Sequence, residues 1–269
     1  MSMRLWHQSF TVLGNLPAYN DALAAHFRKV ARPDTEIVLH GMHPDTYRTS
    51  YPGTDIRHAP LMNLHGLQFV TAGLRAEEDG FDGYMVMTLP EPHLEDVRAV
   101  LDIPVVGYGE SAMLTAMMMG ERIGVLLFIP EIGPRIARNA ARIGISQRFA
   151  GCFHAGFSFN DVLGAFDDPS AVLDTFRTHA RAAIEKGVDA IIPGEAPLCV
   201  LLARNSVSEV DGVPIVDGLA ATVKMAEMQV DLRRSIGLRP SRRGHFAEPP
   251  PRERLKELLD FYGPGRLGD

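Results

Sequence analysis

The sequence predicts an α/β protein with parallel sheets. Short apolar segments alternate with longer segments whose apolar residues are spaced three or four apart, and Gly, Pro and Asp separate them. One stretch of sequence also recurs about a hundred residues later, which indicates two modules of the same design. The chain has 269 residues, 46% of them hydrophobic and 22% charged, so it can build a sizeable core.

The expected strands are short runs that are apolar enough to be buried on both faces, as parallel sheets require. They lie at residues 4–7, 36–41, 84–87, 104–107, 123–128, 190–193 and 214–216. The segments between them have helical periodicity, and we interpret their apolar residues as core packing. These helices are expected at residues 18–31, 65–79, 95–101, 134–143, 171–186 and 220–236.

The internal repeat joins a helix end, a turn and a buried strand. Residues 80–88 (GFDGYMVMT) align without a gap with residues 187–195 (GVDAIIPGE). A second pair of segments, 103–107 (IPVVG) and 213–217 (VPIVD), follows at nearly the same offset. The two modules are therefore expected to form two pseudo-symmetric three-layer α/β domains.

The residues that end the same strand in each module are Thr88 and Glu195. Ligands of open parallel sheets bind outside the carboxyl ends of the strands, so these two side chains are candidates for a shared cleft between the domains. An alternative is that each residue only caps the next helix, and Pro197 fits such a helix start.

Four segments of the chain resemble the aspartate/glutamate/hydantoin racemase superfamily, in particular its hydantoin racemase branch. They are residues 82–92, 103–112, 187–195 and 213–224, of which the last is the most specific (VPIVDGLAATVK). The resemblance implies two similar α/β domains with the active site in a cleft between them. It also implies proton transfer, without a cofactor, at a carbon next to a carbonyl or carboxylate group.

Racemases of this family use one cysteine from each module, and the resemblance places Thr88 and Glu195 at those two positions. The chain's only cysteines, Cys152 and Cys199, lie elsewhere. A threonine hydroxyl is a poor acid and a poorer base, whereas a desolvated glutamate reaches a pKa suited to general base catalysis. We therefore expect Glu195 to act as the base and Thr88 to donate a hydrogen bond to the substrate or intermediate, in one-sided chemistry such as isomerisation, decarboxylation or hydrolysis.

The remaining candidate residues are expected to bind the substrate. They are Gln8 and Thr11 after the first strand, His43 after the second, and Leu89, Pro90 and Ala196 beside the two catalytic candidates. Backbone amides at the two helix starts would stabilise an oxyanion. Glu131, in the loop at 128–131, would repel an anion, which favours a less anionic, more apolar or cyclic substrate, possibly a cyclic amide.

Composition argues against several other functions. A net charge of −6 and a pI near 5.9 disfavour nucleic-acid binding, and no apolar run approaches the roughly 20 residues of a membrane span. The N-terminal residues lack a signal-peptide pattern, so we expect a cytoplasmic protein with a small-molecule substrate. The histidine spacings do not favour a metal site, and neither a metal nor a cofactor is expected.

We expect the first domain to comprise residues 1–107 and 219–237, the second residues 108–218, and residues 238–269 a Pro/Arg-rich appendage with a short amphipathic helix. A homo-oligomer is also expected. Two alternatives to the racemase or isomerase hypothesis remain open. One is a hydrolase or decarboxylase on the same scaffold, which uses a water activated by Glu195 or one-sided proton transfer. The other is a ligand-binding protein that has lost catalysis together with the two cysteines.

Overall fold

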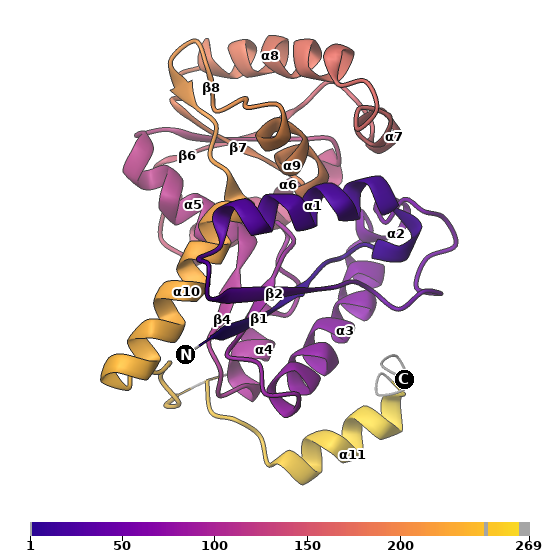
Figure 1. Cartoon of the computed structure of the whole chain (residues 1–269), viewed down its shortest axis with the longest axis vertical. Helices are drawn as coiled ribbons and strands as arrows, with labels where there is room; N and C mark the ends of the chain where they lie inside the picture. Colours follow the sequence, from indigo (N-terminus) through magenta and orange to yellow (C-terminus); the bar gives the residue numbers. More distant parts are fainter. Residues whose placement is uncertain (1, 245–246, 264–269) are drawn as a thin grey trace.

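Two parallel sheets organise the computed structural model, which describes residues 2–244 and 247–263 (Figure 1). The first sheet has the strand order β2-β1-β3-β4 and the second the order β6-β5-β7. The first consists of β1 (Met3–Gln8), β2 (Thr35–His40), β3 (Gly83–Val86) and β4 (Val105–Gly107). The second consists of β5 (Ile123–Leu127), β6 (Phe149–His154) and β7 (Ala190–Pro193).

The two sheets share one topology, which confirms the predicted α/β class with parallel sheets. In each sheet the first strand pairs on one side with the second and on the other with the third. A parallel bridge between Ile191 and Ile215 then takes the position that β4 has in the first sheet. The repeated segments therefore fold as β3 and β7, at equivalent places in the two sheets.

The strand expected at residues 214–216 is mostly absent. Residues Val213–Pro214 instead form β9, which pairs antiparallel with β8 (Glu209–Val210). Pro214 has no amide hydrogen to donate to a parallel ladder, and Asp217 already caps the following helix by accepting a hydrogen bond from the Ala220 amide at 2.9 Å. The ladder to β7 is reduced to a bridge at Ile215 and a hydrogen bond from the Val216 amide to the Ile191 carbonyl.

The helices that were expected from the sequence begin and end within a few residues of the expected bounds, except at the start of α3. Pro60 in its first turn extends that helix six residues further towards the N-terminus than expected. The described helices with sequence precedents are α1 (Pro17–Val30), α3 (Ala59–Glu78), α4 (Leu94–Val100), α6 (Gly133–Arg142), α8 (Ser170–Ile184) and α10 (Gly218–Ile236). Of α9 (Ala196–Arg204) only the start was expected, from Pro197. Those not anticipated are α2 (Gly53–Ile56), α5 (Tyr108–Met119), α7 (Phe159–Gly164) and the 3-10 turns η1 (Leu13–Asn15) and η2 (Pro130–Ile132).

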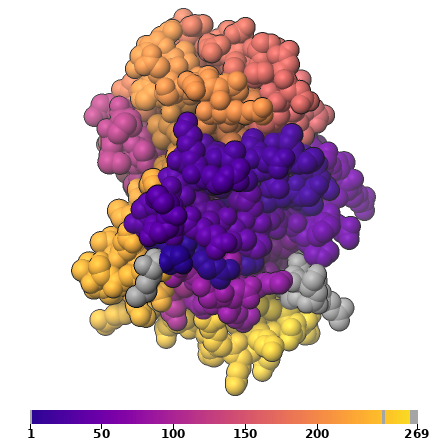
Figure 2. Space-filling view, in the orientation of Figure 1, coloured from indigo at the N-terminus to yellow at the C-terminus, as the bar shows by residue number. Residues whose placement is uncertain are grey.

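The first half of the molecule contains the sheet of β1 to β4, and the second half contains the sheet of β5 to β7. The two halves contact each other through helices. Helix α1 of the first half packs on α9 of the second, at the boundary between the indigo and orange surfaces in the space-filling view (Figure 2). Helix α5 contacts both α10 and β7, and α10 in turn returns to β3 and β4. The hydroxyl of the buried Tyr108, at the start of α5, donates a hydrogen bond to the Pro193 carbonyl at 3.1 Å.

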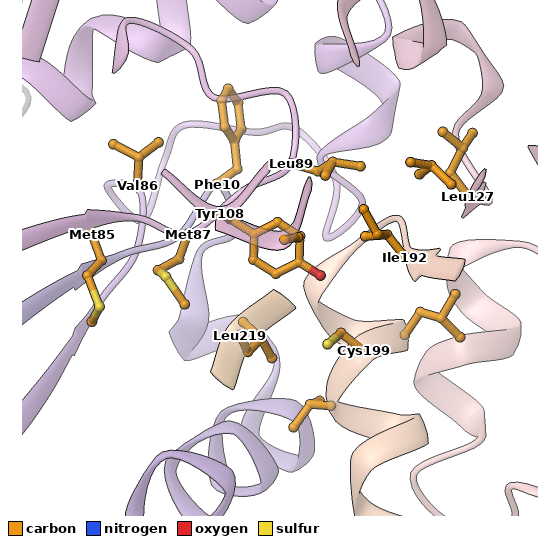
Figure 3. Close-up of a cluster of buried hydrophobic side chains, with 14 of the residues drawn as sticks. Phe10, Met85, Val86, Met87, Leu89, Tyr108, Leu127, Ile192, Cys199 and Leu219 are labelled. Atoms are coloured by element: carbon orange, nitrogen blue, oxygen red, sulfur yellow. The ribbon is translucent and has the colours of Figure 1, made fainter. Parts of the chain in front are cut away.

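Tyr108 belongs to the apolar cluster behind the strand ends (Figure 3). Its ring lies among Met87, Leu89 and Leu219, and its hydroxyl points towards Ile192 and Cys199. A Cβ atom on Gly218 would contact the Tyr108 ring at 2.8 Å, so only glycine fits at this crossing of α10 over α5. The cluster joins β3, which precedes Thr88, to β7, which precedes Glu195.

The C-terminal segment lies apart from both sheets (Figure 1). The Arg242 guanidinium donates to the carbonyl groups of Arg98 and Ala99 at 2.7 and 3.1 Å, and the Arg252 guanidinium pairs with Glu77. The expected amphipathic helix forms as α11 (Arg252–Tyr262), while residues 245–246 and 264–269 of the expected appendage lie outside the described residues. None of the described helices is both long and apolar enough to span a bilayer.

Candidate functional site

The structure brings Thr88 and Glu195 to one pocket between the two halves. Both side chains are partly exposed to this pocket, each from the loop that follows its strand. The first half also contributes the loop after β1 and the start of α2, and the second half the loop after β5 and the start of α7. A site at the carboxyl ends of two parallel sheets is the arrangement that the repeat predicts.

Glu195 is held by backbone amides of the neighbouring strand end. Its Oε1 atom accepts hydrogen bonds from the amides of Phe128 at 3.2 Å and Ile129 at 3.1 Å, and its Oε2 lies 3.3 Å from the Phe128 amide. Burial of the carboxyl group raises the pKa of Glu195 to about 8, although the two amide hydrogen bonds act in the opposite direction. The carboxyl group is therefore fixed in position and can exist in either protonation state near neutral pH.

Gly194 allows this contact between the two loops. Its amide donates to the Leu126 carbonyl at 2.6 Å, and a Cβ atom on Gly194 would lie 2.5 Å from Cβ of Leu127. Because only glycine tolerates that approach, the turn lies directly against β5 and Glu195 reaches the amides beyond it. Glu195 is also the N-cap residue of α9, although its side chain does not cap that helix.

Thr88 is placed differently, by side chains of helix α6 from the second half. The Pro90 carbonyl accepts hydrogen bonds from Arg135 Nε at 3.2 Å and from Asn139 Nδ2 at 3.1 Å. Arg135 also reaches the carbonyl of Glu91, a residue with a left-handed backbone (φ 47°). The next helix, α4, begins only at Leu94. The expectation of a helix start with free amides next to Leu89 is therefore wrong, because two prolines and this turn intervene, whereas α9 does begin at Ala196 as expected.

The turn after Thr88 contains a buried carboxyl group. Oε1 of Glu91 accepts a hydrogen bond from the Glu110 amide at 2.7 Å, and Oε2 lies 3.7 Å from the Arg142 guanidinium. Burial raises the pKa of Glu91 to about 7, and the charge of Glu110 adds to this effect while the Glu110 amide and the arginines oppose it. Glu91 does not line the pocket, and it joins the turn to α5 and α6.

Most of the pocket wall is apolar or aromatic. Glu195 is the only charged residue among the described residues that line it. The lining residues that were not anticipated from the sequence include Ser9, Tyr19, Tyr51 and Phe159. The buried Tyr19 hydroxyl has no hydrogen-bond partner of good geometry in the described part of the chain, and burial raises its pKa. Its position in the first turn of α1, the helix after β1, could have identified it as a site residue.

Four of the six substrate-binding candidates line the pocket: Thr11, Leu89, Pro90 and Ala196. Gln8 and His43 do not. The Gln8 side chain is buried, where it accepts a hydrogen bond from Trp6 Nε1 at 3.0 Å and donates one to the Gly41 carbonyl at 2.9 Å. The partly buried His43 lies beside α3, with its amide bonded to Gln68 Oε1 at 2.9 Å.

Neither cysteine lines this pocket. The Cys199 thiol lies one turn along α9 from Glu195, donates to Asp217 Oδ1 at 3.4 Å, and borders a second cavity of about 310 Å³. Burial raises the pKa of both thiols, that of Cys152 to about 12 with a contribution from the charge of Glu195. Neither thiol is therefore available as a thiolate near neutral pH.

The histidines serve other contacts. His40 stacks on Trp6, and His93 pairs with Asp96 at 2.7 Å, which raises the His93 pKa. Over residues 2–244 and 247–263, no three His, Cys, Asp or Glu side chains gather closely enough to hold a metal ion.

Comparison with known proteins connects this geometry to a family. A model described as Asp/Glu/Hydantoin racemase matches residues 17–226. Hydantoin racemase from Pseudomonas sp. strain NS671 is 29% identical over 237 residues, which cover 87% of this chain and 88% of that protein. Allantoin racemase from Klebsiella pneumoniae has the same fold, with a TM-score of 0.75 at 24% identity over 93% of this chain and 95% of that one. Allantoin racemase from Pseudomonas fluorescens has a TM-score of 0.72 at 25% identity, over 93% and 98%.

Proposed function

The chain belongs to the Asp/Glu/hydantoin racemase family, and on that premise we propose that it catalyses proton transfer at a carbon next to a carbonyl group, with Glu195 as the base. The observation that carries the proposal is the meeting of Thr88 and Glu195 in one pocket, from equivalent strand ends of the two sheets. A planar carbanion held between them presents one face to each side chain. No cofactor is part of the proposed reaction.

Glu195 removes the proton in its ionised form and returns it in its neutral form. A pKa of about 8 leaves about a tenth of the carboxyl groups ionised at pH 7, and it makes the ionised fraction a strong base for a carboxylate. The amides of Phe128 and Ile129 hold the carboxyl group in place throughout the cycle. The same residue therefore suffices for abstraction and return on one face of the substrate.

The first half supplies neutral hydrogen-bonding groups. Both Thr88 and Tyr19 line the pocket, and in the proposed reaction their hydroxyls donate to the oxygen that becomes negative when the proton leaves, as an oxyanion site requires. A threonine hydroxyl does not protonate a carbanion efficiently, so the face opposite Glu195 lacks a competent acid. We therefore propose that hydrogen exchange on the Glu195 side is faster than inversion.

The substrate is proposed to be an uncharged cyclic amide. The only charge on the described pocket wall is that of Glu195, which repels carboxylate substrates, and the aromatic wall suits a flat, uncharged ring. The names of the relatives are consistent with this class, because hydantoin is a cyclic imide and allantoin carries the same ring.

The test uses a single enantiomer of 5-methylhydantoin. It follows the hydrogen on the ring carbon that carries the methyl group and lies next to a ring carbonyl. Proton NMR in deuterated buffer measures loss of this hydrogen, chiral chromatography measures inversion, and a protein-free sample corrects for spontaneous exchange. The wild type is expected to exchange the hydrogen faster than it inverts the carbon.

Glu195→Gln is the matched control, since it keeps the shape of the side chain and an oxygen for the two amides. It is expected to slow exchange by about 10²- to 10⁴-fold, the usual contribution of a general base, with little change in melting temperature. Exchange at the wild-type rate in this variant would remove Glu195 from the mechanism. Ring opening that disappears in the variant would instead assign hydrolysis.

A further inference from the structure

Two aromatic rings that line the pocket stack on each other, one from each half of the molecule. Tyr51 lies in the connection between β2 and α2, and Phe159 is the first residue of α7. Their ring centroids are 4.8 Å apart and their planes differ by 22°, which is a stacked arrangement. Nearby, the Arg57 guanidinium of the first half lies 4.0 Å from the Glu131 carboxylate of the second.

The pocket that these two rings line encloses little space in this structure. Its interior measures about 50 Å³, whereas sites for small organic ligands usually enclose about 300 Å³ or more. Parts of the wall therefore have to separate before a ring can enter. The turn after Thr88 is fixed by α6, and Glu195 by the strand-end amides, so both are poor candidates for that movement.

Tyr51 is the less restrained side of the stack. It is partly exposed, and its hydroxyl has no hydrogen-bond partner in the described ranges of the chain, whereas Phe159 is buried and also packs on Phe128. The ring of Tyr51 lies directly over Gly53, where any Cβ atom would overlap it. Burial raises the pKa of Tyr51 to about 12, and the charge of Glu195 contributes, which indicates that the ring lies near the proposed base.

We propose that Tyr51 and Phe159 form an aromatic gate that selects substrates with a flat aromatic substituent on the reacting carbon. The substituent replaces the contact between the two rings and lies between them, because the polar end of the substrate is directed to Thr88 and Glu195. A flat ring stacks on both faces of the gate, whereas a saturated ring of similar size is too thick to do so. This inference rests on the proposed function for the orientation of the substrate.

The test measures binding of ligands that cannot react. 5-Methyl-5-phenylhydantoin and 5-methyl-5-cyclohexylhydantoin have no hydrogen on the carbon at issue, and they differ in the flatness of one ring. Isothermal titration of the wild type is expected to show about tenfold tighter binding of the phenyl compound, although cyclohexyl is the more apolar group. Equal binding, preference for cyclohexyl, or no binding of either compound would overturn the gate.

Four variants test whether the preference for the phenyl compound arises from the rings of Tyr51 and Phe159. Tyr51→Phe keeps the ring and is expected to retain it, whereas Tyr51→Ala is expected to reduce it to about twofold or less. Gly53→Ala keeps Tyr51 but displaces its ring, and Phe159→Leu removes the opposite ring while keeping an apolar side chain, so both are expected to reduce the preference as well. These two also carry the test if Tyr51→Ala does not fold.

Two outcomes contradict the gate and one separates it from the catalytic proposal. A tenfold preference that survives in Tyr51→Ala or in both Gly53→Ala and Phe159→Leu would overturn it, as would equal losses in Tyr51→Phe and Tyr51→Ala. Glu195→Gln is expected to keep the phenyl preference. A wild-type protein that shows the preference but exchanges no hydrogen would leave the gate standing and refute the proposed function.

Discussion

The ends of β3 and β7 make equivalent backbone hydrogen bonds but present side chains of different chemistry. The Met87 amide donates to the Gln8 carbonyl at 2.9 Å, and the Gly194 amide makes the equivalent bond to Leu126 at 2.6 Å. After these matching bonds the chain presents Thr88 in one half and Glu195 in the other. The repeat therefore fixes where the two side chains lie without fixing what they do.

The loops that face these residues differ in the same way. In the first half, the hydroxyl of Ser9 accepts the hydrogen bond of the Thr11 amide at 3.1 Å. In the second half, the corresponding positions are occupied by Leu127 and Ile129, and the Ile129 amide donates to Glu195 instead. An apolar residue in place of Ser9 thus leaves strand-end amides free to hold a carboxyl group. The comparison shows how one half of a symmetric fold acquires a base while the other remains neutral.

The pH dependence of exchange provides the largest expected effect of this difference. Glu195 has to be ionised to accept a proton, and its pKa is about 8. The value of kcat/KM for exchange is therefore expected to rise about tenfold for each pH unit below 8 and to level off above it. Proton NMR at pH values between 6 and 9 measures this profile.

Thr88→Val is the control, since it removes the hydroxyl without altering the base. It is expected to lower the rate at every pH and to leave the midpoint unchanged. A profile that is flat between pH 6 and pH 8 would contradict the assignment of Glu195, because the ionised fraction of its carboxyl group changes most in that range.

A thiol at position 88 is expected to reduce the difference in protonation rate between the two faces of the carbanion. Thr88→Cys supplies a group with an ordinary pKa near 8.5, which can protonate a carbanion far better than a hydroxyl does. The ratio of inversion to exchange is expected to rise by about tenfold, as measured by chiral chromatography and NMR on the same samples. Thr88→Ser keeps a hydroxyl and is expected to keep the wild-type ratio. If the two variants invert at the same rate, the face opposite Glu195 is not limited by its acid.

Much of the fold and the positions of the two central residues could be predicted from the sequence. The strands at β3 and β7 are continuous apolar runs, and their recurrence places Thr88 and Glu195 at equivalent strand ends. Helix α5 was not anticipated because it lies between α10 and β7 and is apolar on most sides, so it lacks the polar face that helical periodicity requires. Periodicity identifies elements with one exposed side and fails for those without one.

The rest of the site depends on tertiary contacts that no local pattern records. Gln8 and Ser9 are adjacent, yet the side chain of Gln8 is bonded to Gly41 and Ser9 lines the pocket, because successive side chains at a strand end point in opposite directions. Tyr51 and Phe159 belong to short helices and loops more than a hundred residues apart. Only the packing of the two halves brings their rings together.

The smallest expected effect concerns the hydrogen bonds by which α6 fixes the turn after Thr88. Asn139→Ala removes a hydrogen bond from the buried Pro90 carbonyl, which keeps its bond from Arg135, so the free energy of unfolding is expected to fall by about 1 kcal/mol in urea denaturation. Because this bond crosses from α6 to the Thr88 turn, exchange is also expected to slow a few-fold, with the pH midpoint unchanged. Asn205→Ala is the matched control, since its amide bonds the Leu201 carbonyl within α9 at 2.8 Å. A rate loss in the control equal to that in Asn139→Ala would show that the turn at Thr88 does not depend on support from the other half.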